Sequence, residues 1–209
     1  MEMIMRHVFL AVAAMSGSFG MAGEPIDIGD RLELMVDDFL IERFDGRAEF
    51  RLHRPVQREV VFSCDQPWEG NWSGLVTFIQ DGATYRMYYT AGEWGRGRAA
   101  ICYAESKDGV RWTRPKLGLV AYGGSKENNI ILPGKGIIAF VPFKDTNPDC
   151  KPGEQFKAMV AQTKPERALY GYASPDGIHW RAMQGQPLIT RGQFDSQNVA
   201  FWDTGRGRY

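Results

Sequence analysis

Apolar and polar residues alternate in four short runs between residues 75 and 113, and turn sequences separate the runs. The runs cover residues 75–80, 85–90, 99–105 and 110–113. Two of the separating turns contain Asp-Gly, at Asp81-Gly82 and at Asp108-Gly109. Asp-Gly between alternating apolar runs is a strong short-range signal of a β-hairpin. Four short antiparallel strands joined by such turns predict a sheet of the size of a propeller blade.

One hairpin sequence occurs twice in the chain. Ser106–Trp112 reads Ser-Lys-Asp-Gly-Val-Arg-Trp, and Ser174–Trp180 reads Ser-Pro-Asp-Gly-Ile-His-Trp. We expect a bulged three-residue turn in each copy, with Gly109 and Gly177 in the left-handed conformation. In this interpretation the aspartate and the glycine serve the turn, and the tryptophan serves the core.

A second set of apolar runs follows the first with a period of about 62 residues, which is in the range of long structural repeats. This set covers residues 137–143, 156–160, 169–173 and 178–180. Val199–Trp202 begins a third set, in which Tyr209 aligns with Tyr85. The sequence therefore predicts an all-β fold with a little over two four-stranded antiparallel blades. Because so short a third blade cannot bury its face, we interpret the chain as a piece of a longer protein.

The N-terminal segment has the composition of a secretory signal. Basic residues precede the apolar run Val8–Met15, and small residues follow it up to Ala22. This order of regions predicts a signal peptide over residues 1–22 and a secreted or periplasmic protein. The alternative, a buried first helix, is less favoured because the apolar run is too short to span a bilayer.

The remaining residues, 23–209, are expected to form one incomplete propeller domain. Before its first blade we predict a strand at residues 32–36, a helix at 39–44 and a strand at 48–52. The adjacent acids Asp37-Asp38 are read as a helix cap rather than as a catalytic pair, because neighbouring side chains point in different directions.

Charge and cysteine content exclude several classes of function. The chain has 25 basic and 25 acidic residues, so nothing favours nucleic acid as a partner. No long apolar run outside the N-terminus predicts a membrane span. The three cysteines lack metal-type spacing, so no metal site or cofactor is predicted. They allow one disulfide and one free thiol, or no disulfide, and Cys102 is expected to be a small core residue.

Short motifs spread over residues 26–209 carry a resemblance to a known group of proteins. They are Glu33–Ile41, Leu52–Pro55, Pro67–Asn71, Cys102–Gly109, Asn128–Leu132, Phe143–Pro148 and Phe194–Asn198. Through them the chain resembles exported bacterial five-bladed β-propeller proteins that are similar to glycoside hydrolase families 32 and 43. The resemblance implies a partial five-bladed propeller with a sugar-binding funnel at its axis, lined by the starts of the innermost strands.

Three acids lie in loops that this fold would place at the funnel. Asp195 precedes an innermost strand and is our first candidate for the catalytic base or nucleophile, with a turn-stabilising role as the alternative. Glu69 is the candidate acid, and its alternative is a loop acid beside core tryptophans. Asp145 could orient a partner, although capping of the Asn147-Pro148 turn is favoured. A glycosidase needs two such carboxylates, one of them protonated.

Five neighbouring residues are predicted to bind the sugar. Aromatic rings can stack on sugar faces, and amide groups can bind hydroxyls. The candidates are Trp68, Asn71, Trp72, Gln197 and Asn198. The apolar segment 136–139 departs from the polar character expected before the second blade, and a third carboxylate is expected beyond Tyr209.

These observations predict a glycoside hydrolase-like propeller that acts on an extracellular glycan by acid–base chemistry. The alternative is a non-catalytic propeller that binds carbohydrate or serves as a scaffold, and residues 1–209 alone are then expected to be inactive. An all-β interaction module without sugar affinity has no positive support in the sequence. The oligomeric state is left open.

Overall fold

The computed structural model describes residues 24–93, 98–134 and 136–209. The predicted signal peptide, residues 1–22, therefore lies outside the described residues. The backbone divides into two units, of which the first ends at Gln57 and the second runs from Arg58 to Tyr209. None of the described residues forms a helix with the length and apolar character needed to cross a bilayer.

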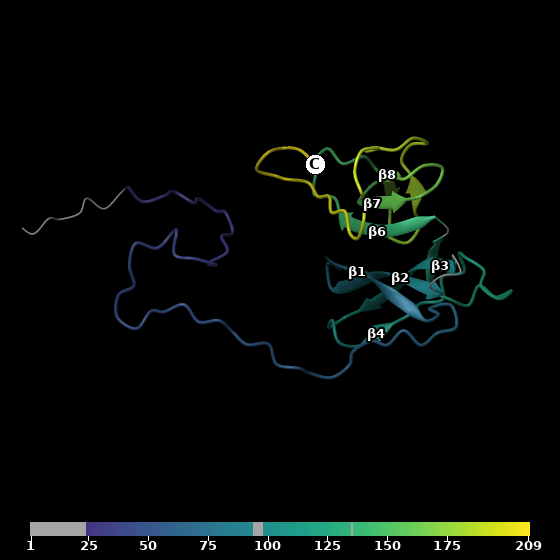
Figure 1. Cartoon of the computed structure of the whole chain (residues 1–209), viewed down its shortest axis with the longest axis horizontal. Helices are drawn as coiled ribbons and strands as arrows, with labels where there is room; N and C mark the ends of the chain where they lie inside the picture. Colours follow the sequence, from purple (N-terminus) through teal and green to yellow (C-terminus); the bar gives the residue numbers. More distant parts are fainter. Residues whose placement is uncertain (1–23, 94–97, 135) are drawn as a thin grey trace, which may run out of the picture. The chain divides into compact units, whose positions relative to one another are not determined.

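The second unit begins with a five-stranded sheet (Figure 1). Its strands are β1 (Trp72–Asp81), β2 (Thr84–Glu93), β3 (Arg98–Ser106), β4 (Trp112–Thr113) and β5 (Ile130–Pro133). Strands β1 to β4 lie in sequence order, and β5 pairs with β3 beside β4. The sequence predicted four of these strands, although β1 begins at Trp72 instead of Leu75. Strand β5 was not predicted, because its apolar run does not alternate.

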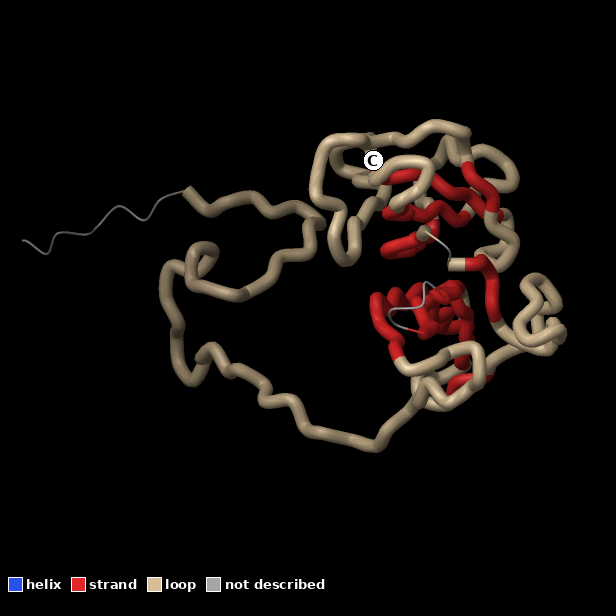
Figure 2. The backbone as a smooth tube through the Cα atoms, turned by 45° about the vertical axis from the view of Figure 1, so that its right-hand side comes forward, coloured by secondary structure: helices blue, strands red, loops and turns tan. Residues whose placement is uncertain are grey.

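The second sheet repeats this arrangement. Its strands are β6 (Ile137–Lys144), β7 (Phe156–Gln162), β8 (Ala168–Ser174) and β9 (Arg181–Ala182), again in sequence order. The predicted strand at 178–180 was wrong, because these residues belong to the loop and the fourth strand follows them. All strand pairs in both sheets are antiparallel. Figure 2 shows strands and loops but no helix in the described chain. The predicted all-β fold with antiparallel, blade-like sheets is confirmed, whereas a five-bladed ring stays a prediction.

The run Val199–Trp202 is not a strand in the structure, although the sequence predicted the first strand of a third blade there. A strand requires a hydrogen-bonded neighbour. Among the described residues nothing pairs with this run, and the segment after it closes on itself through a bridge between Asp203 and Arg208. The predicted strand at this run was therefore wrong, because the apolar pattern carries no information about a pairing partner.

The two sheets of the second unit share a core. Strands β1 and β2 pack against β6. Tyr88 lies at the centre of this core, and its ring centroid is 5.4 Å from that of Tyr103 and 6.2 Å from those of Phe140 and Trp180. Tyr88, Tyr103 and Phe140 are almost completely buried. These aromatic contacts fix the second sheet on one face of the first.

The first unit differs from its prediction. The structure has no strand at residues 32–36 or 48–52 and no helix at 39–44, so these three predictions were wrong. Asp37 Oδ1 accepts a bond from the Phe39 N–H at 3.1 Å, as a cap would, but no helix follows. Leu32 and Leu34 are 101% and 84% exposed. Short helices and strands need a packing surface, and the first unit does not provide one for these side chains.

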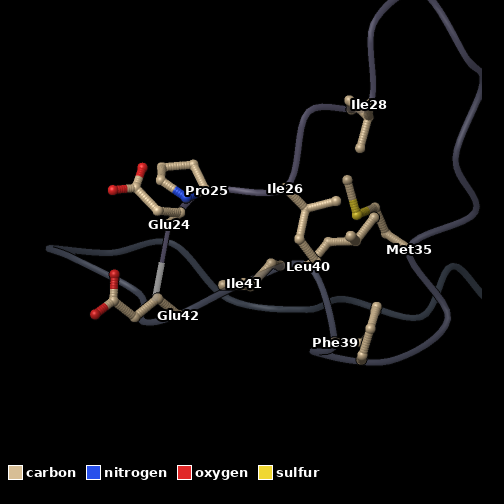
Figure 3. A pocket seen from close by; sticks show the side chains of 9 residues that line it. All are labelled: Glu24, Pro25, Ile26, Ile28, Met35, Phe39, Leu40, Ile41 and Glu42. Carbon is tan, nitrogen blue, oxygen red and sulfur yellow. The ribbon is translucent and has the colours of Figure 1, made fainter. Parts of the chain in front are cut away.

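A few apolar side chains of the first unit surround a hollow of about 460 Å³ (Figure 3). Its lining includes Ile26, Ile28, Met35 and Leu40, with Glu24 and Glu42 at one side. Phe39, which also lines it, is 77% exposed. The hollow lacks the convergent polar groups that orient a ligand, so we do not assign a site to it.

Candidate functional site

Strand β1 of the first sheet contains a β-bulge at Leu75 and Val76. Gly74 pairs with Thr90 and Thr77 pairs with Tyr88, so Leu75 and Val76 lie opposite the single residue Tyr89. Leu75 has a φ of 51°, which is the left-handed region that side chains with a Cβ rarely adopt. The bulge interrupts the β1–β2 ladder near the place where the sequence predicted the funnel.

The loop that carries Asp195 is strained in the same way. Phe194 has a φ of 50° and Ser196 a φ of 57°. Together with Leu75, these are the non-glycine residues with positive φ in the described part of the chain. Asp195 lies between two of them, its side chain is exposed, and its Oδ1 accepts a bond from the Ser196 N–H at 2.8 Å. The three strained residues therefore mark the bulge and this loop.

Polar and apolar contacts join the loop to the bulge. The side-chain amide of Gln197 donates to the Val76 carbonyl and contacts Thr77 Oγ1, both at 3.1 Å. Phe194 belongs to a buried cluster with Ala139, Ala161 and Leu169, and Leu75 packs against that cluster. Strand β1, strand β6 and the Asp195 loop therefore meet at one place. A sugar-binding funnel there stays a prediction.

Glu69 lies elsewhere, in the interior of the first sheet. Its side chain is completely buried. Arg114 donates from Nε to Oε1 at 2.8 Å and from Nη2 to Oε2 at 3.1 Å, and the Tyr89 hydroxyl donates to Oε1 at 2.5 Å. Burial opposes the charge of Arg114, but the interactions with Glu69 and Tyr89 together outweigh this and raise the pKa of Arg114. These contacts favour a structural role of Glu69 over that of a catalytic acid.

The loop around Glu69 is held tightly against β2. Gly92 donates its N–H to the Glu69 carbonyl at 2.9 Å, and the Asn71 N–H donates to the Gly92 carbonyl at 3.1 Å. At Gly70, which has a φ of 62°, a Cβ would lie 2.3 Å from the Gly92 oxygen. Only glycine can stand there, because both the conformation and the close approach exclude a side chain.

The two tryptophans near Glu69 are partly buried and contribute to packing. Trp68 is half-buried against the cluster that contains Tyr89 and Cys102, and its indole N–H donates to Asn129 Oδ1 at 2.7 Å. Trp72 is half-buried at the start of β1. Cys102 is fully buried, as predicted, and the three cysteines are free thiols. Sugar stacking on Trp68 or Trp72 stays a prediction.

Asp145 directly follows β6, in an environment different from those of Asp195 and Glu69. Its side chain is buried and pairs with Lys157, while the Tyr209 hydroxyl donates to Oδ2 at 2.7 Å. Burial opposes ionisation, but the bonds from Lys157 and Tyr209 prevail and lower the pKa of Asp145. The Asn147 N–H donates to Oδ1 at 3.0 Å. This contact supports the turn-capping role that the sequence favoured.

The predicted site residues therefore occupy three separate environments. Gln197 lies beside Asp195 but uses its amide on β1, and Asn198 is half-buried with its amide 3.4 Å from the Ser196 carbonyl. Among the described residues no basic side chain pairs with Asp195, in contrast to Glu69 and Asp145. The described residues also contain no cluster of three or more His, Cys, Asp or Glu side chains that could hold a metal ion.

Sequence reasoning missed two structural partners of the site. Arg114 holds Glu69, although the two residues are far apart in the sequence. Asn129 accepts from Trp68 and donates to the Tyr89 hydroxyl at 2.8 Å and to the Tyr103 carbonyl. The motif Asn128–Leu132 contained this asparagine, but nothing in the motif indicated its partners.

Comparisons with known proteins give limited similarity. No protein-family model matches the chain. Two uncharacterized proteins, each from one strain of Mycobacterium tuberculosis, are 26% identical to it over 132 residues, which is 58% of this chain and 35% of each relative. The match thus spans about a third of the length of these curated relatives. A solved structure described as a glycosyl hydrolase from Bacteroides ovatus has 18% identity and a TM-score of 0.41, and the match covers 68% of this chain and 42% of that one. At these values the likeness does not assign the chain to a family.

Proposed function

We propose that the second unit belongs to a carbohydrate-binding protein of the propeller type, and that Asp195 is the acid that contacts the bound sugar. The observation that carries this proposal is the strain around Asp195. The left-handed residues Phe194 and Ser196 flank it, and left-handed Leu75 lies in the bulge to which the loop is attached. Each such residue costs about 1–3 kcal/mol, and strain of this kind clusters at binding and active sites.

The chemistry of Asp195 fits sugar recognition. A carboxylate offers two oxygens with about four lone-pair positions, and Ser196 uses one of them. The remaining positions can accept hydrogen bonds from a pair of neighbouring hydroxyl groups. Such charge-assisted bonds are stronger than bonds between neutral groups. A glycan outside the cytoplasm is the ligand that suits the secreted or periplasmic location predicted from the N-terminus.

Binding is favoured over hydrolysis by the state of the other two acids. Glycoside hydrolysis needs one protonated and one ionised carboxyl group beside the scissile bond. Glu69 and Asp145 form ion pairs with Arg114 and Lys157, and both carboxylate side chains are completely buried, so neither is exposed to a bound sugar. Hydrolysis, the second candidate, is motivated by the motif resemblance and requires a different acid as the partner of Asp195.

Asp195→Asn in the natural protein tests the proposal. A panel of immobilised glycans identifies the ligand, and calorimetry with that glycan measures the affinity. Loss of the charged acceptor is expected to weaken binding by about tenfold or more. Asp149→Asn removes another exposed acid and is expected to leave the affinity unchanged. Equal affinities of the Asp195→Asn variant and the wild type would refute the proposed role, and release of reducing sugar by the wild type would favour hydrolysis.

A further inference from the structure

Two basic residues occupy the same position in the two sheets. Tyr85 pairs with Ser106 and Phe156 pairs with Ser174, at the start of the two Asp-Gly loops, so the next residues, Arg86 and Lys157, correspond. Both are ion-paired to an acid at the end of the preceding strand. The pairs are Arg86 with Asp81 and Lys157 with Asp145.

The two basic residues also have corresponding aromatic neighbours later in the chain. The Arg86 guanidinium lies 5.0 Å from the ring centroid of Phe156, and Lys157 Nζ lies 5.2 Å from that of Tyr209. Tyr209 therefore contacts the basic residue of the second sheet in the same way as Phe156 contacts that of the first. In each sheet the basic residue thus lies on the face that contacts a later part of the chain.

On the first sheet, the Arg86 face is occupied by the loop Ser174–Trp180. Arg86 Nη1 donates to the Asp176 carbonyl at 2.7 Å, and the Tyr88 hydroxyl donates to the Gly177 carbonyl at 3.0 Å. A Cβ on Gly177 would lie 2.6 Å from the Tyr88 hydroxyl oxygen. The glycine thus serves the contact between the sheets as well as the turn.

On the second sheet, the Lys157 face has an apolar pocket of about 190 Å³. Its lining includes Phe143, Met159, Met183, Leu188 and Tyr209 beside Lys157. The face carries no Asp-Gly loop from the described residues. Ala200 and Tyr209 also line part of the pocket.

Lys157 has a proton available for a further acceptor. An ammonium group has three protons. Nζ donates to Asp145 and to the Tyr209 hydroxyl at 3.0 Å, and the next neighbour is Cys150 Sγ at 3.7 Å, which is a weak acceptor. A turn carbonyl is a stronger acceptor than this sulfur. Arg86 provides the precedent, because it binds its acid and a turn carbonyl at the same time.

We propose that the Lys157 face is a docking surface for a third Asp-Gly β-hairpin of the Ser174–Trp180 type. The carbonyl of the turn accepts from Lys157 Nζ, and the aromatic residue three positions after the glycine enters the apolar pocket. The proposal does not depend on the proposed carbohydrate binding.

A cyclised peptide with the sequence of residues 168–182 is the probe. Cyclisation is needed because an isolated two-stranded hairpin is marginally stable in water. The peptide is titrated into the 209-residue chain labelled with ¹³C at its methionine methyl groups. Met159 and Met183 line the pocket, whereas Met87 belongs to the buried cluster on the other face of the first sheet. We expect saturable shifts of the Met159 and Met183 signals and none at Met87.

Matched variants separate docking from nonspecific binding. Lys157→Met is expected to weaken peptide binding about tenfold, since a bond from a charged donor is lost. Lys151→Met removes an exposed lysine nearby and is expected to bind as the wild type does. If Lys157→Met does not fold, the wild-type chain is titrated with a peptide that carries Trp180→Ala. That peptide is expected to lose binding, and unchanged binding would contradict the proposal.

Three results would overturn the proposal. They are the absence of shifts at millimolar peptide, equal shifts at Met87 and the two pocket methionines, and unchanged binding to a folded Lys157→Met variant. Shifts at Met159 and Met183 that depend on protein concentration without peptide would assign the surface to a second copy of this chain, and would also refute the hairpin as its occupant.

Discussion

The two Asp-Gly loops have the same interior but different surroundings. In each loop the serine Oγ accepts from the N–H of the aspartate and the glycine, and the aspartate Oδ1 accepts from the next two N–H groups. The glycines have φ values of 73° and 76°. Gly177 is buried against Tyr88, whereas a Cβ on Gly109 would have no neighbour within 4 Å. A repeated sequence therefore repeats the turn but not the contacts outside it.

The comparison also corrects the predicted turn. The left-handed glycines are confirmed, but the three-residue turn was wrong. Ser106 pairs with Trp112 and Ala173 pairs with Arg181, so both loops are longer. The serine and aspartate side chains bind the N–H groups that a tighter turn would pair across the strands.

The largest expected difference between the loops comes from adding a methyl group to each glycine. Gly177→Ala places a Cβ against the Tyr88 hydroxyl, so left-handed strain adds to a disrupted inter-sheet hydrogen bond, and we expect a loss of about 3 kcal/mol in the free energy of unfolding. Gly109→Ala has the strain alone, with an expected loss of about 1 kcal/mol. Urea unfolding followed by tryptophan fluorescence measures both, and equal losses would contradict the docked position of the second loop.

The contrast between a docked and a free loop explains what the sequence could predict. The apolar runs and the turns between them predicted both sheets and their strand order, although the middle strands β2, β7 and β8 are buried on both faces. The apolar pattern also predicted a strand directly after the Asp195 loop, which the structure does not have. The left-handed conformations at Leu75, Phe194 and Ser196 had no signal, because these residue types do not favour that region. Tertiary contacts impose them.

Side-chain contacts between residues far apart in the sequence could not be predicted either. Nothing near Glu69 in the sequence indicated that Arg114 pairs with it, so its burial and its ion pair could not be predicted. The docking of Asp176 and Gly177 on Arg86 and Tyr88 was also missed, because the first copy of the motif makes the same turn without such contacts. In the first unit, apolar patterns predicted elements that have no surface to pack on.

A smaller difference is expected from the arginines associated with the two loops. Arg86 pairs with Asp81, holds the Asp176 carbonyl and is 16% exposed in its side chain. Arg86→Met breaks these partly buried bonds, and we expect a loss of about 2 kcal/mol in the free energy of unfolding. Arg111 pairs with Asp108 but is 87% exposed, so Arg111→Met is expected to cost less than about 0.5 kcal/mol. A loss of the same size in both variants, measured by urea unfolding, would show that Arg86 does not hold the second loop.

The smallest expected difference concerns the acid titration of the two aspartates. Bonds from the Arg111 and Val110 N–H groups lower the pKa of Asp108 to about 2. At Asp176 burial opposes ionisation, but bonds from the His179 N–H and ring outweigh it and lower the pKa further. Carboxyl ¹³C signals followed by NMR from pH 6 to pH 1.5 should therefore move at lower pH for Asp176 than for Asp108.

The sign of the linked stability follows from these directions. Both aspartates have a lower pKa in the folded chain than the value of about 3.9 expected when unfolded, so their stabilising contribution is present above about pH 4. For Asp108 it is lost as the pH falls toward about 2, and for Asp176 the loss continues to lower pH. Asp176→Asn should flatten the acid limb of the stability curve more than Asp108→Asn does. The reverse order would mean that the docked environment of the second loop does not favour its charged aspartate.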